Sequence, residues 1–142
     1  MQIMQNLNFK TQNQSSKFKS SSPQKIKIDL KQRSYRFALR VINFIDQLPR
    51  NMGCEIIGRQ LLRCATSIGA NIAEARAASS RKDFTNFIVY SLKSANESIF
   101  WIELLRDSGK AGGADLESLY LESVEISKIL GSSVLTLKGK RQ

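Results

Sequence analysis

The chain contains no histidine at all, and only two cysteines and two prolines among its 142 residues. Without histidine it lacks the commonest general base, the commonest metal ligand, and the Ser-His and Cys-His pairs that activate nucleophiles. Cys54 and Cys64 fall on one expected helix about 15 Å apart, too far for an intrachain disulfide, and their spacing is not that of a C-x-x-C zinc site. We therefore predict no catalytic centre, no metal and no cofactor, and a reducing compartment in which both cysteines act as small apolar residues.

Long apolar segments are missing as well. The segment from Met1 to Lys10 lacks the apolar run of a signal peptide, and no segment approaches about eighteen consecutive apolar residues. We expect a soluble, cytoplasmic protein without a membrane partner.

What the chain has in excess is positive charge. It carries 22 lysines and arginines against 12 acidic residues, a net charge of +10, which favours polyanionic partners and nucleic acid first. Half of this excess lies in residues 1–27, which hold five lysines and no acid. Residues 1–28 are rich in Gln, Asn, Ser and Lys, so we predict a disordered basic tail. Its lysines, Lys25 and Lys27 included, either grip phosphates or belong to a solvated extension without a function.

From Asp29 onward the apolar residues recur with helical periodicity, and no run is typical of a strand. Four helices are predicted, over residues 29–48, 54–77, 80–108 and 114–137. Joined by short loops, they predict an all-α fold, an up-down-up-down antiparallel four-helix bundle over residues 29–142 that follows the disordered basic tail. The apolar residues predicted to face the core of the last three helices are Ile57, Leu61, Ala65, Ile68, Ile72, Phe84, Phe87, Ile88, Ala95, Ile99, Ile102, Leu116, Leu119, Val124, Leu130, Val134 and Leu137.

Local signals mark where these helices begin and end. Pro49 stops the first helix, and Ser80 with Asp83 has the spacing of a capping box at the start of the third. The run from Gly109 to Gly113 ends the third helix; its lysine precedes the later glycines and no strand comes before it, so it is not a phosphate-binding loop. Gly69, in the middle of the second helix, indicates either a kink or a close helix contact.

The first helix carries more apolar surface than a bundle core needs. Its apolar residues form two adjacent stripes that together cover about 220° of the helix, whereas a helix in a monomeric bundle needs little more than about 100°. The surplus predicts a subunit interface. One stripe consists of Tyr35, Ala38, Leu39, Ile42 and Ile45, and the other of Leu30, Phe37, Val41, Phe44 and Leu48.

Arginines form the most informative polar pattern. Arg33, Arg36 and Arg40 share one face of the first helix, and that face carries no acidic residue. Arg59 and Arg63 form an i, i+4 pair on the second helix. Like charges at this spacing repel, and arginine makes bidentate contacts with phosphate, so both stripes are candidate nucleic-acid contacts. A solvated helix face is the alternative for each. No helix-turn-helix or RNA-recognition sheet is evident, so binding should be electrostatic and weakly sequence-specific.

Three stretches of the sequence resemble a known family. They are Ser67-Ile-Gly-Ala-Asn-Ile-Ala-Glu-Ala, Ala78-Ser-Ser-Arg-Lys-Asp-Phe and Ser94-Ala-Asn-Glu-Ser-Ile-Phe-Trp-Ile-Glu-Leu-Leu. From about Leu30 to Lys138 the chain resembles the bacterial four helix bundle proteins, also called 23S rRNA-intervening sequence proteins. The residues that match the family's signature are Ser67, Asn71, Glu74, Lys82, Asp83, Phe84, Glu97 and Trp101. Two features depart from it: many relatives have proline near Gly69, and the basic tail is not a family feature.

The resemblance implies a four-helix protomer that assembles into a homopentamer. A related branch, the accessory protein of diversity-generating retroelements, is a basic pentamer that binds nucleic acid and a reverse transcriptase. Our first hypothesis is a non-enzymatic homo-oligomer that binds RNA or DNA through the five arginines; the second is an assembly scaffold for a protein such as a reverse transcriptase. We interpret Asn71 and Glu74 as structural residues that satisfy backbone groups and fix helix packing, in preference to a ligand site.

Overall fold

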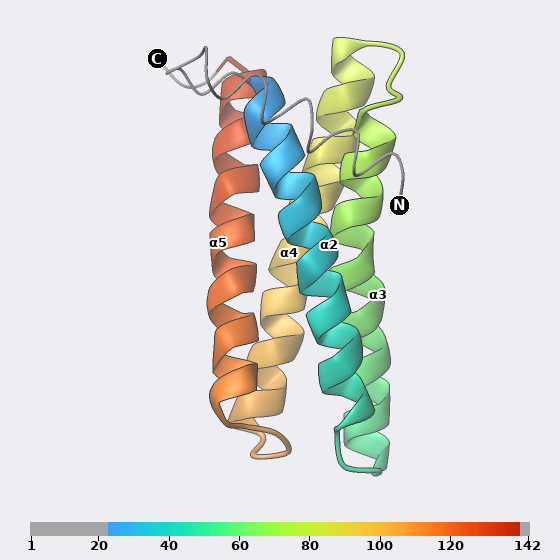
Figure 1. The fold of residues 1–142 in the computed structure, drawn as a ribbon, viewed down its shortest axis with the longest axis vertical. Helices are drawn as coiled ribbons and strands as arrows, with labels where there is room; N and C mark the ends of the chain where they lie inside the picture. The colour runs from blue at the N-terminus through green and yellow to red at the C-terminus, as the bar shows by residue number, and fades with distance from the viewer. Residues whose placement is uncertain (1–22, 140–142) are drawn as a thin grey trace.

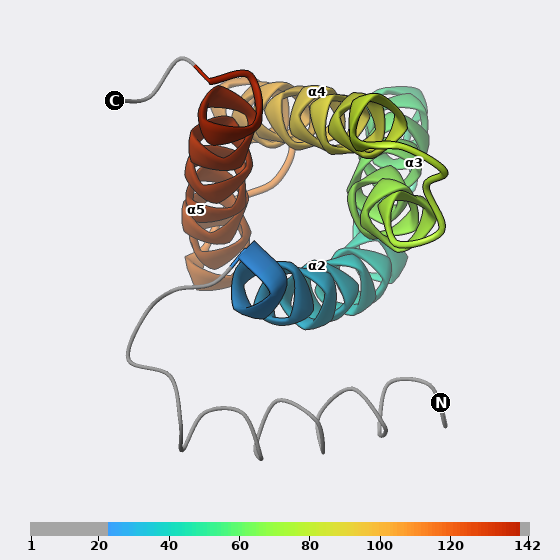
Figure 2. The same ribbon diagram turned by 90° about the horizontal axis from the view of Figure 1, so that it is seen from above.

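Four antiparallel helices make up the described part of the chain. The computed structural model describes residues 23–139, with side chains from Leu30 onward, and contains no strand in this range. In chain order the helices are α2 (Pro23–Asp46), α3 (Met52–Ala75), α4 (Arg81–Asp107) and α5 (Ala114–Leu137) (Figure 1). Viewed along the bundle they form a ring in which each helix lies beside the next and α5 returns to α2 (Figure 2). The predicted all-α, up-down-up-down four-helix bundle is confirmed.

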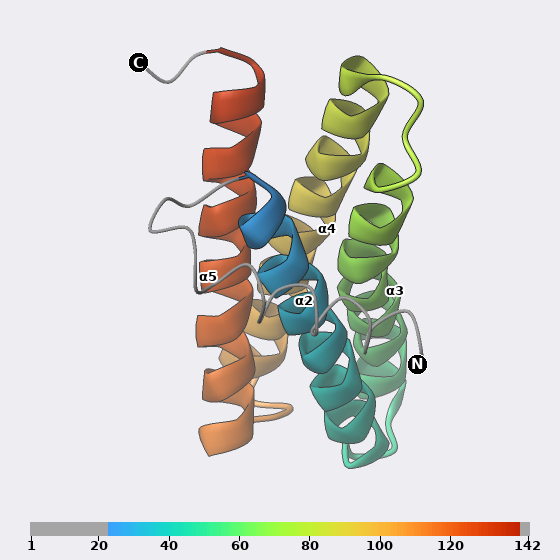
Figure 3. The same ribbon diagram turned by 45° about the horizontal axis from the view of Figure 1, so that its top comes forward.

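The helix ends lie within a few residues of the predicted ones, except at the start of α2. This helix begins at Pro23, six residues before the predicted start at Asp29. A proline is well suited to a first helical turn, where its missing N–H would have no intrahelical partner. The predicted tail otherwise falls on residues 1–22, which lie outside the described residues. Figure 3 shows that α2 slants across the bundle against α5.

Side-chain caps fix the starts of α3 and α4. The Asn51 side chain accepts a hydrogen bond from the backbone N–H of Cys54 (2.9 Å), and the Ser80 hydroxyl accepts one from that of Asp83 (3.1 Å). The Asp83 carboxylate in turn accepts from the backbone N–H of Ser79 (3.2 Å). The first bond of the predicted capping box is therefore present, while the returning bond goes to the residue before the N-cap instead of to the N-cap itself. At its other end α4 stops at Gly109, whose φ of 69° suits a helix terminator.

The core runs the length of the bundle and includes most of the predicted residues. Phe37, Leu61, Ile102 and Leu130 are all buried, one from each helix. Six of the predicted core residues are only partly buried. Four of them still pack against the core, namely Ile57, Phe84, Phe87 and Leu137; the other two are Ile99 and Val124. Four serines with full burial were not predicted: Ser34, Ser91, Ser98 and Ser123.

Only one of the two apolar stripes of α2 packs into this core. Leu30, Phe37 and Val41 of that stripe are buried, and the other stripe is largely exposed. At Gly69 the helices α2 and α3 approach closely, since a Cβ atom there would lie 3.6 Å from the Cβ of Ser34. The helices are thus in contact at Gly69, but 3.6 Å is an ordinary van der Waals distance, so the contact alone does not require glycine.

Candidate nucleic-acid interface

The arginines of α2 line the seam between α2 and α5. Arg33 donates two hydrogen bonds to the Glu122 carboxylate of α5, from Nε to Oε1 (2.6 Å) and from Nη2 to Oε2 (2.9 Å). Arg40 donates from Nη2 to the Ser118 hydroxyl of α5 (2.6 Å). Arg36 lies between them in sequence and is exposed. We call the junction of α2 and α5, together with Arg33, Arg36 and Arg40, the α2–α5 seam.

Glu122 changes the electrostatics of that seam. Its hydrogen bonds with Arg33 raise the pKa of the guanidinium and lower the pKa of the Glu122 carboxyl. The charge of Arg33 is therefore compensated within the protomer, which leaves Arg36 and Arg40 as the cations of the seam that face no carboxylate at hydrogen-bond distance. The arginine face of α2 has no acidic residue from its own helix. Its acidic partner is Glu122 of α5, 89 positions after Arg33 in the sequence.

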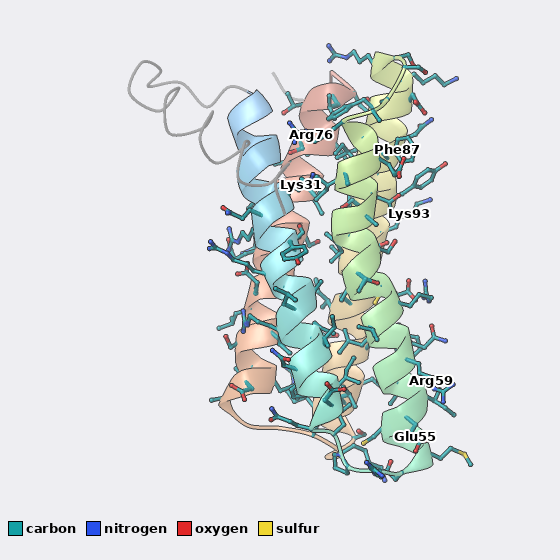
Figure 4. The ribbon with its side chains drawn as sticks, turned by 45° about the vertical axis from the view of Figure 1, so that its right-hand side comes forward. Lys31, Glu55, Arg59, Arg76, Phe87 and Lys93 are labelled. Carbon is teal, nitrogen blue, oxygen red and sulfur yellow. The ribbon has the colours of Figure 1, made fainter. Side chains whose placement is uncertain are left out.

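The arginines of α3 lie on a different side of the molecule. Arg63 donates from Nη2 to the Glu97 carboxylate of α4 and from Nε to Gln60 (3.2 Å). Trp101 donates from Nε1 to the same Glu97 oxygen (3.2 Å). Arg59, one turn earlier, is exposed on the outside of α3 (Figure 4).

These two arginine groups do not form one surface on a protomer. The α2–α5 seam and the junction of α3 with α4 lie on opposite sides of the ring of helices (Figure 2). Lys25 and Lys27 belong to α2, but their side chains lie outside the described residues. A ligand that contacts all the predicted arginines of one chain would have to bend around the bundle.

The family-signature residues line the junction of α3 and α4, which we call the α3–α4 seam. Asn71 donates from Nδ2 to the backbone carbonyl of Ser67 (2.9 Å) and to its hydroxyl (3.0 Å), and the Ser94 hydroxyl donates to the Ser67 hydroxyl across the seam (3.1 Å). Ser67, Asn71 and Glu74 follow one another at i, i+4 and i+7, and Glu74 is exposed. Asp83 caps α4, while Glu97 joins Trp101 to Arg63. Of these contacts, Ser94–Ser67 and Arg63–Glu97 link α3 to α4, Asn71–Ser67 and Trp101–Glu97 lie within one helix, and Asp83 caps α4.

Buried small residues continue the same seam. The Ser91 hydroxyl donates to the backbone carbonyl of Ile68 (2.8 Å), and that of Ser98 donates to the Cys64 sulfur (3.1 Å) and lies 2.9 Å from the backbone carbonyl of Ser94. Burial raises the pKa of the Cys64 thiol, and both cysteines are free and buried. The thiol is therefore held in its neutral, weakly nucleophilic form.

Two groups of exposed apolar side chains lie on other faces, in addition to single exposed residues such as Ile56 of α3 and Tyr90 of α4. On α2, Tyr35, Leu39 and Ile42 are 47%, 45% and 40% exposed and follow the spacing i, i+4, i+7. They lie on the side of α2 toward α3, because Ile45, one turn on, faces Gly58 of α3. We call this the α2–α3 face; Lys31 and Arg76 lie toward one end of it and Glu55 toward the other (Figure 4).

The second apolar face lies across the ring, on α4 and α5. Phe100 (54% exposed) and Leu104 come one and two turns after Asn96, whose side chain accepts a hydrogen bond from Ser127 of α5 (2.6 Å). Leu135, two turns after Ser127, is also exposed. We call this the α4–α5 face. The two apolar faces differ in composition and point in opposite directions (Figure 2).

Metal binding and membrane insertion each make specific demands on side chains and helices. Residues 23–139 contain no group of three or more Cys, Asp or Glu side chains suited to holding a metal ion. Among the four described helices, none has both the length and the apolar character needed to cross a membrane.

Comparison with known proteins gives a family and similar solved structures. The model of the family described as 23S rRNA-intervening sequence protein matches residues 26–132. A protein of unknown function from the S23 ribosomal protein family of Bacteroides thetaiotaomicron has a similar crystal structure, with a TM-score of 0.71 and 38% sequence identity. That similarity covers 77% of this chain and 97% of the other. No curated protein matches the chain.

Proposed function

The chain belongs to the 23S rRNA-intervening sequence protein family, and on that premise we propose that it is a non-enzymatic, cytoplasmic homo-oligomer that binds nucleic acid through phosphate contacts. The observation that carries this proposal is the lengthwise division of the outward side of α2. One stripe, with Leu39 and Ile42, is apolar and exposed; the other, with Arg36 and Arg40, is made of guanidinium groups. An exposed apolar stripe favours a protein contact, and a stripe of arginines favours phosphate.

The apolar faces support assembly into a closed ring. The α2–α3 face and the α4–α5 face are unlike each other and lie on opposite sides of the bundle. When unlike surfaces of identical subunits meet, the contact is head-to-tail, and it closes into a ring if the rotation per subunit allows it. The resemblance to pentameric relatives suggests five subunits.

Ring assembly would also bring the cationic seams together. If the side faces form the subunit contacts, the α2–α5 seam has the same orientation relative to the ring in every subunit. Arg36 and Arg40 then recur once per subunit, which converts a weak pair into an extended cationic surface. Such a surface would neutralise several phosphates and release their counterions with little reading of bases.

Replacement of Arg36 and Arg40 by glutamine tests the nucleic-acid contact. We expect R36Q/R40Q to bind duplex DNA and RNA more weakly, and the slope of log affinity against log salt for duplex DNA to fall by about 0.9 for each phosphate that the variant no longer neutralises. Fluorescence anisotropy at several salt concentrations measures both, and light scattering should give the same oligomer mass as the unmodified protein. An unchanged affinity in this variant would remove the α2–α5 seam from the proposal.

The second candidate is a scaffold whose partner is a protein, such as a reverse transcriptase. The compensation of Arg33 by Glu122 and of Arg63 by Glu97 favours it, because both pairs lower the free cationic charge of the seams. It predicts weak, non-saturating nucleic-acid binding beside tight binding of the protein partner. Saturable binding with a steep salt dependence, in a protein that begins at Pro23 as well as in the full chain, would favour the first candidate.

A further inference from the structure

One end of the bundle gathers exposed cations, of which the sequence patterns singled out only Lys82, as a residue of the family signature. The start of α2, the turn between α3 and α4, and the end of α5 all lie at this end (Figure 1). Arg76, Arg81, Lys82 and Lys138 are exposed there, with Lys31 close by on α2 (Figure 4). We call these five residues the basic end. Two carboxylates, Glu74 and Asp83, accompany them.

The opposite end of the bundle has the reverse balance. It holds three cations, Arg50, Arg106 and Lys110, with Arg40 and Arg59 about two turns away, against six carboxylates. Those carboxylates are Asp46, Glu55, Glu103, Asp107, Asp115 and Glu117. The described bundle is therefore polarised along its length, although its helices alternate in direction and their dipoles largely cancel.

Helix stability explains part of the basic end but not all of it. Arg76 and Lys138 follow the last turns of α3 and α5, where cations complement the helix dipole. Arg81 donates from Nη2 to the backbone carbonyl of Leu137, one of the unpaired carbonyls at the end of α5 (3.3 Å). Lys82, however, lies in the first turn of α4, where a cation opposes the dipole. An external anion would account for it.

We propose that the basic end is the surface on which a nucleic-acid backbone docks, with Arg76, Lys82 and Lys138 contacting phosphates and Arg81 held in place by α5. This inference rests on the proposed nucleic-acid binding and adds a second location to the α2–α5 seam. The cations stand on separate helix ends, and neighbouring helix axes lie about 8–10 Å apart, so one small phosphate could not reach them together. A polyanion with regularly spaced charges can.

Assembly through the side faces would extend this surface. A ring whose axis follows the helices carries the basic end of every subunit on the same rim. The rim then presents a circle of cations, while the opposite rim carries the carboxylates. The nucleic acid contacts the helix ends at this rim. That contact is separate from the α2–α5 seam, which lies on the side of the bundle.

A pair of charge-matched variants tests the location. R76Q/K82Q and R50Q/K110Q both remove two exposed cations, one pair from each end, and leave Arg81 in place. With a mixed-sequence DNA duplex as the probe, we expect R76Q/K82Q to lose on the order of 50-fold in affinity at 0.1 M salt, from two phosphates at about 0.9 decade each. R50Q/K110Q should stay within about twofold of the unmodified protein, because its cations would contact no phosphate. Circular dichroism and light scattering should give the same helicity and mass for all three proteins.

The alternative outcomes separate the two proposals. Equal losses in the two variants would show that only net charge matters and would overturn the basic end. A loss in R36Q/R40Q with none in R76Q/K82Q would also overturn it, yet would leave nucleic-acid binding on the α2–α5 seam. If the unmodified protein binds neither duplex DNA nor RNA but does bind vesicles of anionic phospholipid, both proposals fail.

Discussion

Assembly through the α2–α3 face predicts that L39Q/I42Q weakens self-association and leaves the protomer folded. Both side chains lie on the exposed stripe of α2, outside the buried core. Glutamine is about as good a helix former as leucine, so the helix itself should be little affected. The substitution therefore acts mainly on the apolar surface that a neighbouring subunit would cover.

The expected magnitude follows from the exposed fractions. Complete burial of a leucine or isoleucine side chain stabilises by about 1.5–3 kcal/mol. Leu39 is 45% exposed and Ile42 40% exposed in the protomer, so each retains about 1 kcal/mol that only assembly can supply. Together they give about 2 kcal/mol per interface, which corresponds to roughly a 30-fold increase in its dissociation constant.

Sedimentation velocity over a wide concentration range measures this change. Ile56→Gln is the matched control: Ile56 is 55% exposed and lies seven residues before Arg63, on the side of α3 that faces α4. We expect the control to keep the dissociation midpoint of the unmodified protein. A protein that is monomeric at every concentration, or an L39Q/I42Q midpoint equal to that of the control, would refute the reasoning.

Two further predictions concern the stability of the protomer. Because the pKa of Glu122 is lowered in the folded state, its contribution is present above the ordinary glutamate pKa of about 4.3 and is lost as the pH falls through the folded-state value. Urea unfolding should therefore find E122Q less stable than the unmodified protein by about 1 kcal/mol at pH 7, with the difference shrinking as the pH falls below the ordinary glutamate pKa; a constant difference would exclude ionisation of Glu122 as the cause. For Gly69→Ala, a Cβ would meet Ser34 no closer than 3.6 Å, so we expect the free energy of unfolding to rise by up to about 1 kcal/mol from helix propensity. A clear loss of stability in the same urea assay would mean that the contact between α2 and α3 has no room for the added methyl group.

The helices could be predicted from sequence because local signals determine them. Period-3.6 apolar residues placed all four, and Ser80 and Gly109 marked two ends that the structure confirms. Pro23 is the exception, since a proline suits the start of a helix as well as a loop. The surplus apolar stripe of α2 was also predictable, as its width exceeded what one core can cover.

Tertiary partners of the charged residues could not be predicted in the same way. Nothing local connects Arg33 with Glu122, or Arg63 with Glu97, because each pair depends on which helix faces become neighbours. The basic end had a partial signal: alternating helix directions bring the third helix's first turn and the fourth helix's last turn to the same end. Applying that rule to the predicted ranges would have brought Lys82 and Lys138 together.

The signature of the family is informative about packing rather than about chemistry. Ser67, Asn71 and Ser94 use their polar groups on one another and on a backbone carbonyl, and Glu97 accepts from both Trp101 and Arg63. A ligand bound among them would have to replace hydrogen bonds that the protomer already makes, at a cost for each group left unpaired. A surface selected for an external partner should instead hold polar groups whose presence the fold does not explain. Arg36 meets that description, and so does Lys82 among the residues of the signature; for that reason function is best sought at the basic end and the α2–α5 seam.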